Sequence, residues 1–264
     1  MSIIEALILG IVQGITEFLP VSSSGHLKLG ELFLGIKELN KYVTFDLVCH
    51  LGTLFAIFLV FYKEIWKVLT QDRKTFWMIV IATLPLAPLY FLLSGIKALY
   101  GLPSYLGFFF LLTALFLYIG EKYSKPVPET ISAKRNIFEA LFIGCAQAVA
   151  ILPAVSRSGS TMAAARFLGW EREKAARFSF FLAIPTILGG ILVETIEIIR
   201  HKEQIADISF FVYLTGFTVS FLVGWMALKL LLKLLQHFTF KPFAYYCFIV
   251  GITTLLYVNF FYQD

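Results

Sequence analysis

Long apolar runs alternate with short polar segments along the whole chain. A helix needs roughly 20 residues to cross the hydrocarbon core of a bilayer, which is about 30 Å thick. Runs of about this length predict full crossings at Thr44–Tyr62, Phe76–Leu93, Ser104–Ile119, Phe178–Ile199, Ile208–Leu228 and Pro242–Tyr262. The hydrophobic pattern therefore predicts an all-α polytopic membrane protein.

Two more apolar regions, Ile3–Leu34 and Ile137–Leu168, are each interrupted in the middle by a polar segment. In each region a proline, Pro20 or Pro153, is followed by a stretch rich in serine and glycine. Proline disfavours helix at the residue before it, and serine is a preferred N-cap for a helix that follows. Each region is therefore predicted to be a re-entrant pair of short helices joined by a polar bend. At membrane depth such backbone is tolerated only where it lines a cavity or is buried in protein.

The two interrupted regions also resemble each other in sequence. Glu5-Ala6-Leu7, Gly10, Gln13, Ser22, Ser24 and Gly25 recur with the same spacing as Glu139-Ala140-Leu141, Gly144, Gln147, Ser156, Ser158 and Gly159. We interpret this as a duplication within one integral membrane domain, with repeats at about 1–125 and 135–264. Each half then holds one re-entrant pair and three crossings. Three crossings invert the second half, and inverted repeats place their sites near the bilayer midplane.

Composition and charge support this interpretation. Hydrophobic residues make up 59% of the chain, which excludes an ordinary soluble domain. The formal net charge is +5, and most lysines and arginines fall in loops that the predicted crossings place on one side. By the positive-inside rule that side is cytoplasmic, so both termini are expected outside. The positive charge is thereby explained without a nucleic-acid partner.

The first polar bend carries groups suited to phosphate chemistry. Gln13 and Glu17 are four residues apart and share a helix face. An amide oxygen and a carboxylate suit a hard cation such as Mg²⁺ or Ca²⁺, held partly by substrate oxygens. Ser23 and His26 are three residues apart on the second helix. A hydroxyl beside an imidazole is typical of an activated nucleophile or an acid–base pair.

The second polar bend carries groups suited to binding phosphate. Arg157 lies among hydroxyl residues at the start of a predicted short helix, where free N–H groups and the helix dipole favour an anion. Its planar guanidinium can bind phosphate oxygens in a bidentate manner. The candidate phosphate-binding residues of the two bends are Arg157, Ser156, Ser158, Thr161 and Ser22.

Structural roles are open for several of these residues. Ser22, Ser24 and Ser158 could simply cap helices, and Arg157 could be an ion-pair partner of Glu17. Asp46 and His50, in the first crossing, could support the site or pair with each other for structural reasons. Glycines 10, 14 and 144 are predicted to be close-packing positions. The occurrence of Glu17, His26 and Arg157 together at bends that the repeat brings together favours a shared site.

At these bends the chain resembles the bacterial undecaprenyl-diphosphate phosphatases of the bacitracin-resistance type. The Glu/Gln-x-x-x-Glu motif of that family, followed by a serine-rich Gly-His bend, corresponds to Gln13–Glu17 and Ser22–His26. Its second motif, Pro-Gly-x-Ser-Arg-Ser-x-x-Thr, corresponds to Pro153–Thr161. Ala154 stands where the family has glycine, so a slightly altered bend is expected if the position needs a positive φ. The resemblance extends over the chain from end to end.

The resemblance implies hydrolysis of undecaprenyl diphosphate to the monophosphate and phosphate in the bacterial plasma membrane, which recycles the lipid carrier for peptidoglycan synthesis. It also implies a divalent cation, a site open to the periplasmic side, and resistance to bacitracin, which competes for the substrate. By motif position, Glu17 with Gln13 would hold the metal or act as base, and Arg157 would clamp the phosphates. The attacking group would be Ser23, His26 or a metal-activated water.

A rival interpretation is a transporter or flippase for a polyprenyl phosphate, because inverted repeats with broken helices are also a transporter architecture. A transporter has no need for a carboxylate–amide pair beside a serine and a histidine, which favours hydrolysis. Membrane lipids are the expected surroundings in either case. The sequence does not distinguish a monomer from a homodimer.

Overall fold

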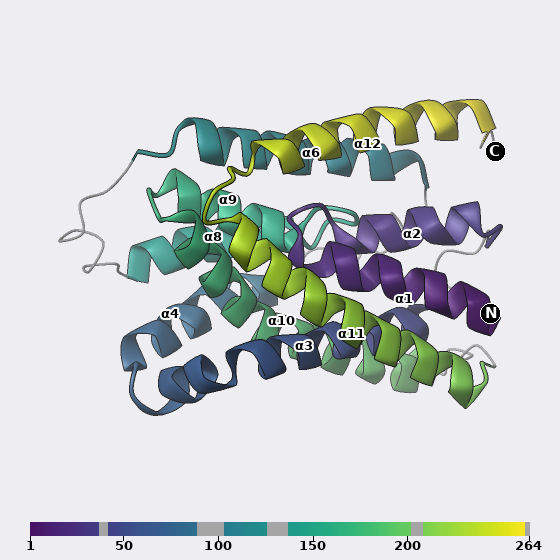
Figure 1. The fold of residues 1–264 in the computed structure, drawn as a ribbon, viewed down its shortest axis with the longest axis horizontal. Coiled ribbons are helices and arrows are strands. Elements are labelled where there is room, and N and C mark those ends of the chain that lie inside the picture. The colour runs from purple at the N-terminus through teal and green to yellow at the C-terminus, as the bar shows by residue number, and fades with distance from the viewer. Residues whose placement is uncertain (37–41, 89–102, 126–136, 202–207, 262–264) are drawn as a thin grey trace.

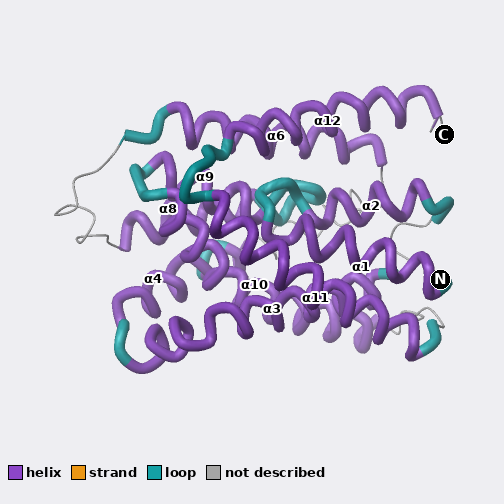
Figure 2. The backbone as a smooth tube through the Cα atoms, viewed as in Figure 1, coloured by secondary structure: helices purple, strands orange, loops and turns teal. Residues whose placement is uncertain are grey.

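The computed structural model describes residues 1–36, 42–88, 103–125, 137–201 and 208–261. This part of the chain consists of helices joined by turns and loops, and it contains no strand (Figures 1 and 2). The helices are α1 (Ile3–Phe18), α2 (Ser23–Phe33), α3 (Val43–Thr70), α4 (Arg73–Thr83), α6 (Pro103–Lys122), α8 (Ile137–Val149), α9 (Arg157–Phe167), α10 (Arg172–His201), α11 (Phe210–Leu234) and α12 (Lys241–Phe261).

Five of these helices, α3, α6, α10, α11 and α12, are long and apolar enough to cross a membrane. They coincide with five of the predicted crossings, which confirms the prediction of an all-α polytopic membrane protein. Helix α3 continues beyond its predicted end at Tyr62, but its backbone leaves helical geometry at Phe61 (φ −112°, ψ 19°). The predicted end of that crossing therefore falls at a kink.

The predicted crossing Phe76–Leu93 is wrong as a continuous helix. Helix α4 ends at Thr83, and a turn at residues 84–85 separates it from a short helical stretch at 86–88. Pro85 explains the break, because proline has no N–H for a helical hydrogen bond and its ring clashes with the preceding turn. The remainder of that predicted crossing lies outside the described residues.

Both interrupted regions form pairs of short helices, as predicted: α1 with α2, and α8 with α9. In Figure 1, α1 and α2 lie toward the end of the molecule where α1 begins and α12 ends, whereas α8 and α9 lie toward the opposite end. The bends of the two pairs approach each other in the interior. The division into repeats inverted across a membrane stays a prediction.

Close packing through glycines brings the short helices α1 and α8 against neighbouring helices. A Cβ on Gly14 of α1 would lie 2.8 Å from the backbone nitrogen of Gly224 in α11. A Cβ on Gly144 of α8 would lie 2.6 Å from the carbonyl oxygen of Ala82 in α4. Both glycines are therefore close-packing positions, as predicted. The buried ring of Phe18, at the end of α1, meets Phe180 of α10 edge to face at 5.7 Å.

The second bend contains a residue in the left-handed region. Ala154 has φ +61°, the conformation for which glycine is the usual residue. For an L-residue this region costs roughly 1–2 kcal/mol. The bend nevertheless closes, and Ala154 is buried against α2, where a Cβ on Gly25 would lie 2.9 Å from the Ala154 Cβ and 2.6 Å from Cζ of Phe110. The expected need for a positive φ is confirmed.

This contact predicts an energetic coupling between the two bends. Gly25→Ala is expected to lower the free energy of unfolding by about 2 kcal/mol through overpacking. In an Ala154→Gly background the loss should be smaller by about 1 kcal/mol, because one of the two clashing methyl groups is absent. Unfolding of the detergent-solubilised variants measures both values. Gly189→Ala in α10 is the control, since its Cβ would meet nothing within 4 Å. Equal losses in both backgrounds would show that the bends are not coupled.

Candidate active site

Glu17, in the last turn of α1, is the centre of the polar site. Its carboxylate side chain is only 3% exposed. It accepts hydrogen bonds from Gln13 Nε2 at 3.0 Å and Ser23 Oγ at 2.6 Å, and Arg157 Nη2 lies 2.5 Å from its other oxygen. The Glu17 carboxylate thus joins α1 to the start of α2 and to the first residue of α9.

Arg157 is the first residue of α9, and the bend around it places its guanidinium beside Glu17. Ser158 Oγ adds a second connection by donating to the carbonyl of Leu19 at 3.2 Å. Within the described part of the chain Glu17 is the hydrogen-bond acceptor for Arg157. The other guanidinium N–H groups are therefore left as donors for a ligand. The structural role considered for Arg157, as ion-pair partner of Glu17, is confirmed and is compatible with phosphate binding.

Two acceptor atoms lie beside this ion pair. His50 of α3 places Nε2 3.6 Å from Glu17 Oε2. Gln13 donates its amide to Glu17, which leaves its buried Oε1 without a hydrogen-bond partner in the described part of the chain. An orphaned buried amide oxygen next to a carboxylate fits a cation ligand, because burying an unpaired polar atom is otherwise costly.

His26 does not pair with Ser23. Its Nδ1 is 2.7 Å from the Ser22 carbonyl oxygen, and its Nε2 is 2.7 Å from the hydroxyl of Tyr246 in α12. The His26 and Tyr246 rings stack at 5.6 Å, and Phe110 packs edge-on against the imidazole. Among the hydrogen bonds of the described residues, none joins Ser23 to His26. The predicted hydroxyl–imidazole pair is therefore not formed in this structure, because Tyr246 binds the basic nitrogen.

The remaining predicted phosphate ligands contact protein groups. Ser22 and Ser156 are N-caps that accept from the backbone of Gly25 and Gly159 at 3.2 and 2.9 Å. Thr161 donates to the Arg157 carbonyl and shares a 2.7 Å hydrogen bond with Ser179. The capping role considered for Ser22 is confirmed. A role for these hydroxyls in phosphate binding stays a prediction.

Asp46, the other polar residue considered in the first crossing, pairs with α2. Lys28 Nζ lies 2.9 Å from Asp46 Oδ2 and 3.0 Å from Glu31 Oε2. This ion cluster fastens the first turn of α3 to α2. His50, one turn further along α3, is thereby held next to Glu17. The role of His50 is open from the sequence alone, and Tyr246, one of 12 tyrosines with no motif around it, cannot be identified from the sequence.

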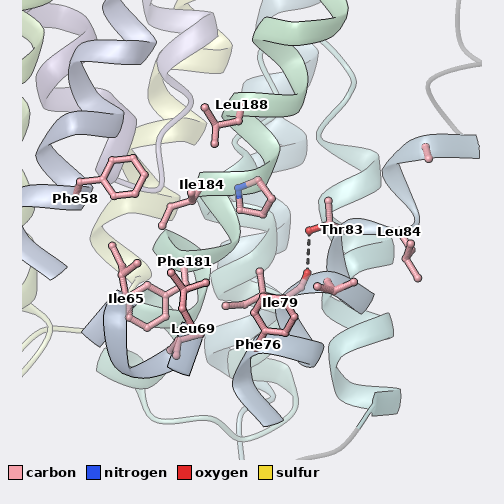
Figure 3. Close-up of a pocket in the computed structure, with 14 residues that line it drawn as sticks. Phe58, Ile65, Leu69, Phe76, Ile79, Thr83, Leu84, Phe181, Ile184 and Leu188 are labelled. Carbon is pink, nitrogen blue, oxygen red and sulfur yellow. Dashed lines mark hydrogen bonds between the residues drawn. The ribbon is translucent and has the colours of Figure 1, made fainter. Parts of the chain in front are cut away.

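A separate pocket of about 540 Å³ lies between α3, α4 and α10 (Figure 3). Phe58, Leu69, Ile79 and Leu188 contribute to its lining, which is almost entirely apolar. The hydroxyl of Thr83 is bound to the carbonyl of Ile79 at 2.8 Å. The pocket therefore offers no group for phosphate, and the site around Glu17 is the candidate for chemistry.

The structure thus defines a multi-pass membrane protein with a buried carboxylate–guanidinium site at two broken helices. The family described as bacitracin resistance protein BacA matches residues 6–253. The chain is 43% identical over 258 residues to the undecaprenyl-diphosphatase of Protochlamydia amoebophila, covering 97% of this chain and 99% of that protein. It is 38% identical over 263 residues to the undecaprenyl-diphosphatase of Carboxydothermus hydrogenoformans, covering 97% of each chain. The chain belongs to the bacitracin resistance protein BacA family, as its motifs indicated.

The buried ion pair predicts a large asymmetry between single and double substitutions. Arg157→Gln leaves the Glu17 carboxylate buried without its cation and is expected to lower the free energy of unfolding by about 3 kcal/mol. The double variant Glu17→Gln/Arg157→Gln should regain most of this loss, because two neutral amides leave no uncompensated charge. Chemical unfolding in detergent measures both variants against the wild type.

The control for this prediction is Arg177→Gln. Arg177 is 35% exposed and pairs with Glu173 at 2.8 Å, so its loss should cost less than about 1 kcal/mol. If the double variant were as unstable as Arg157→Gln, the charge imbalance would not be the cause of the instability.

Proposed function

We propose that this protein hydrolyses undecaprenyl diphosphate to undecaprenyl phosphate and inorganic phosphate, and so recycles the lipid carrier of cell-wall synthesis. The names of its relatives support the substrate. The observation that carries the chemistry is the hydrogen bond from Ser23 Oγ to the Glu17 carboxylate, with Arg157 on the other carboxylate oxygen. A hydroxyl, a base and a fixed cation are thereby joined in one buried cluster.

In the proposed reaction, Ser23 Oγ attacks the terminal phosphorus as Glu17 takes the hydroxyl proton. Undecaprenyl phosphate leaves with the bridging oxygen, and the phosphoryl group stays on Ser23. Glu17 first returns its proton to the departing phosphate. Water then attacks the phosphoserine as Glu17 takes one of the water protons and passes it to Ser23 Oγ, which releases inorganic phosphate and the free hydroxyl. Ser23 is favoured as the nucleophile over His26 because its hydroxyl is already bound to Glu17, whereas the basic nitrogen of His26 faces Tyr246.

Arg157 acts in this proposal as the phosphate clamp. Its N–H groups that are not bound to Glu17 can meet the charge that develops on the equatorial phosphate oxygens. The N-terminus of α9, which starts at Arg157, adds the positive end of a helix dipole. Ser22, Ser156, Ser158 and Thr161 would contribute hydroxyl donors once the substrate displaces their protein partners.

We also propose a divalent cation, Mg²⁺ or Ca²⁺, held by Glu17 and the unpartnered Gln13 Oε1. A bound cation of this kind would neutralise phosphate charge and polarise the phosphoryl group. Gln13 then fixes the Glu17 carboxylate through its amide nitrogen and offers its oxygen to the metal. Among the described residues no group of three or more His, Cys, Asp and Glu side chains is placed to hold a metal alone. The coordination shell would therefore need substrate oxygens and water to complete it.

In the cell we propose a multi-pass protein of the bacterial plasma membrane, with both termini outside and the site open to the periplasmic face. The positive-inside rule supports this orientation, because most loop lysines and arginines fall on the side opposite the termini. Bacitracin would then act on the same lipid that the enzyme binds. Abundant enzyme would confer resistance by consuming that lipid.

The test is phosphate release by the purified protein from a long-chain polyprenyl diphosphate, with Mg²⁺ or Ca²⁺ and with chelator. Ser23→Ala should lower the rate by about 1,000-fold or more, since it removes the nucleophile. Glu17→Gln should lower it by about 100-fold or more, since it removes the base. Ser24→Ala is the matched control: it removes a neighbouring hydroxyl whose hydrogen-bond partner among the described residues is Ser22, at 3.5 Å. Absence of release with every divalent cation would refute hydrolysis and favour the flippase.

A second test addresses Tyr246. Tyr246→Phe keeps the ring that stacks on His26 but removes the hydroxyl at His26 Nε2. One net hydrogen bond is worth about 1 kcal/mol, so the rate should change by about fivefold if His26 takes part in proton transfer. Tyr245→Phe is the control, since this neighbouring residue on α12 is exposed. Unchanged rates in both Tyr246→Phe and His26→Gln would show that this histidine is a packing residue.

A further inference from the structure

His50 of α3 presents an acceptor nitrogen to the proposed reaction centre. Its Nδ1 lies 2.8 Å from the backbone carbonyl oxygen of Asp46, one turn earlier in α3. A carbonyl can only accept, so Nδ1 carries the hydrogen. In the neutral ring Nε2 then has a free lone pair. His50 Nε2 lies 3.6 Å from Glu17 Oε2, so two hydrogen-bond acceptors face each other in a mostly buried space.

A positive charge between these two atoms is needed to make the arrangement favourable. A proton on Nε2 would draw the pair to the roughly 2.7–2.9 Å of a charge-assisted hydrogen bond. The observed separation is longer. Two ligands bound at about 2.1–2.4 Å to one cation, at right angles, lie about 3.0–3.4 Å apart. The separation of 3.6 Å is closer to that of two ligands of one metal ion.

Two more observations point to the same ligand. The buried Oε1 of Gln13 has no partner in the described part of the chain, while the amide nitrogen of the same side chain contacts Glu17 Oε2 at 3.0 Å. Metal-binding histidines commonly donate their other ring N–H to a carbonyl or carboxylate, as His50 does to Asp46. The ion pair between Lys28 and Asp46 holds that carbonyl in place from α2.

We propose that His50 Nε2 is a ligand of the divalent cation, beside Glu17 and Gln13 Oε1, and that it sets the metal preference of the site. This inference rests on the proposed function, because the cation is the one that the phosphatase reaction uses. An imidazole nitrogen suits Mn²⁺, Co²⁺ or Zn²⁺ better than Mg²⁺ or Ca²⁺, which prefer oxygen. The site is therefore expected to bind Mn²⁺ more tightly than Mg²⁺.

The decisive measurement is pulsed electron paramagnetic resonance of Mn²⁺ bound to protein that carries ¹⁵N-labelled histidine. Any affinity tag rich in histidine must first be removed. The wild-type protein should show electron–nuclear coupling between Mn²⁺ and an imidazole nitrogen, and His50→Gln should abolish it. Gln offers an oxygen in place of the nitrogen, so Mn²⁺ should still bind. The loss of Mn²⁺ affinity should be at most about tenfold. His26→Gln and His237→Gln are the controls, and both should retain the coupling.

Phosphate release gives a second readout of the same proposal. In the wild type, Mn²⁺ should activate at a concentration at least about tenfold below that of Mg²⁺. His50→Gln should reduce this ratio by about tenfold, because it replaces a nitrogen ligand by oxygen. Bound Mn²⁺ without nitrogen coupling in the wild type would overturn the role of His50 while phosphate release continues. Absence of phosphate release with every metal would instead overturn the proposed function, whatever the spectrum shows.

Discussion

The ion pair between Glu17 and Arg157 is the interaction on which the rest of the site depends. Glu17 lies at the end of α1 and Arg157 at the start of α9, each next to the bend of its helix pair. The two residues are 140 positions apart in the sequence. A carboxylate or a guanidinium buried alone in an apolar interior is costly, so each bend supplies the partner that the charge of the other needs. The close contact of Gly25 with Ala154 and the bond from Ser158 to Leu19 follow from bringing the two bends to this distance.

The negative charge of Glu17 and the positive charge of Arg157 balance each other within this pair. Glu17 accepts from an amide, a hydroxyl and a guanidinium, so its charge is distributed over three donors. A diphosphate that enters shares Arg157 with this carboxylate, because it binds the guanidinium N–H groups that Glu17 does not occupy. A ligand with several charged oxygens makes more of these contacts than one with few, which would distinguish the proposed substrate from its monophosphate product.

Much of the architecture could be predicted because membrane crossing and helix breaking leave local signals. Apolar runs located five long helices, and Pro20, Pro153 and the serines after them located both broken pairs. The proximity of Glu17 and Arg157 followed from the likeness between the two bends. The prediction for α4 is wrong because the apolar run continues past Pro85, whereas the helix ends at Thr83, just before this proline.

The side-chain partners inside the site could not be predicted in the same way. Ser23 and His26 have the spacing of a catalytic pair, yet Tyr246 from α12 takes the imidazole nitrogen. His50 reaches Glu17 because α3 is fixed to α2 by Lys28 and Asp46. These outcomes depend on contacts between helices distant in sequence and on side-chain rotamers, which spacing along one helix does not determine.

The length of α1 has a consequence for the medium in which the proposed reaction takes place. A helix of 16 residues is about 24 Å long, less than the roughly 30 Å of the hydrocarbon core. In the proposed re-entrant arrangement, with the start of α1 at the membrane surface, the bend that follows α1 lies within the hydrocarbon core, where the bilayer itself holds almost no water. In this low-polarity environment, polar groups of the protein stabilise the charges of the reaction in place of water. Each charge that moves during phosphate transfer is then felt more strongly than it would be in water.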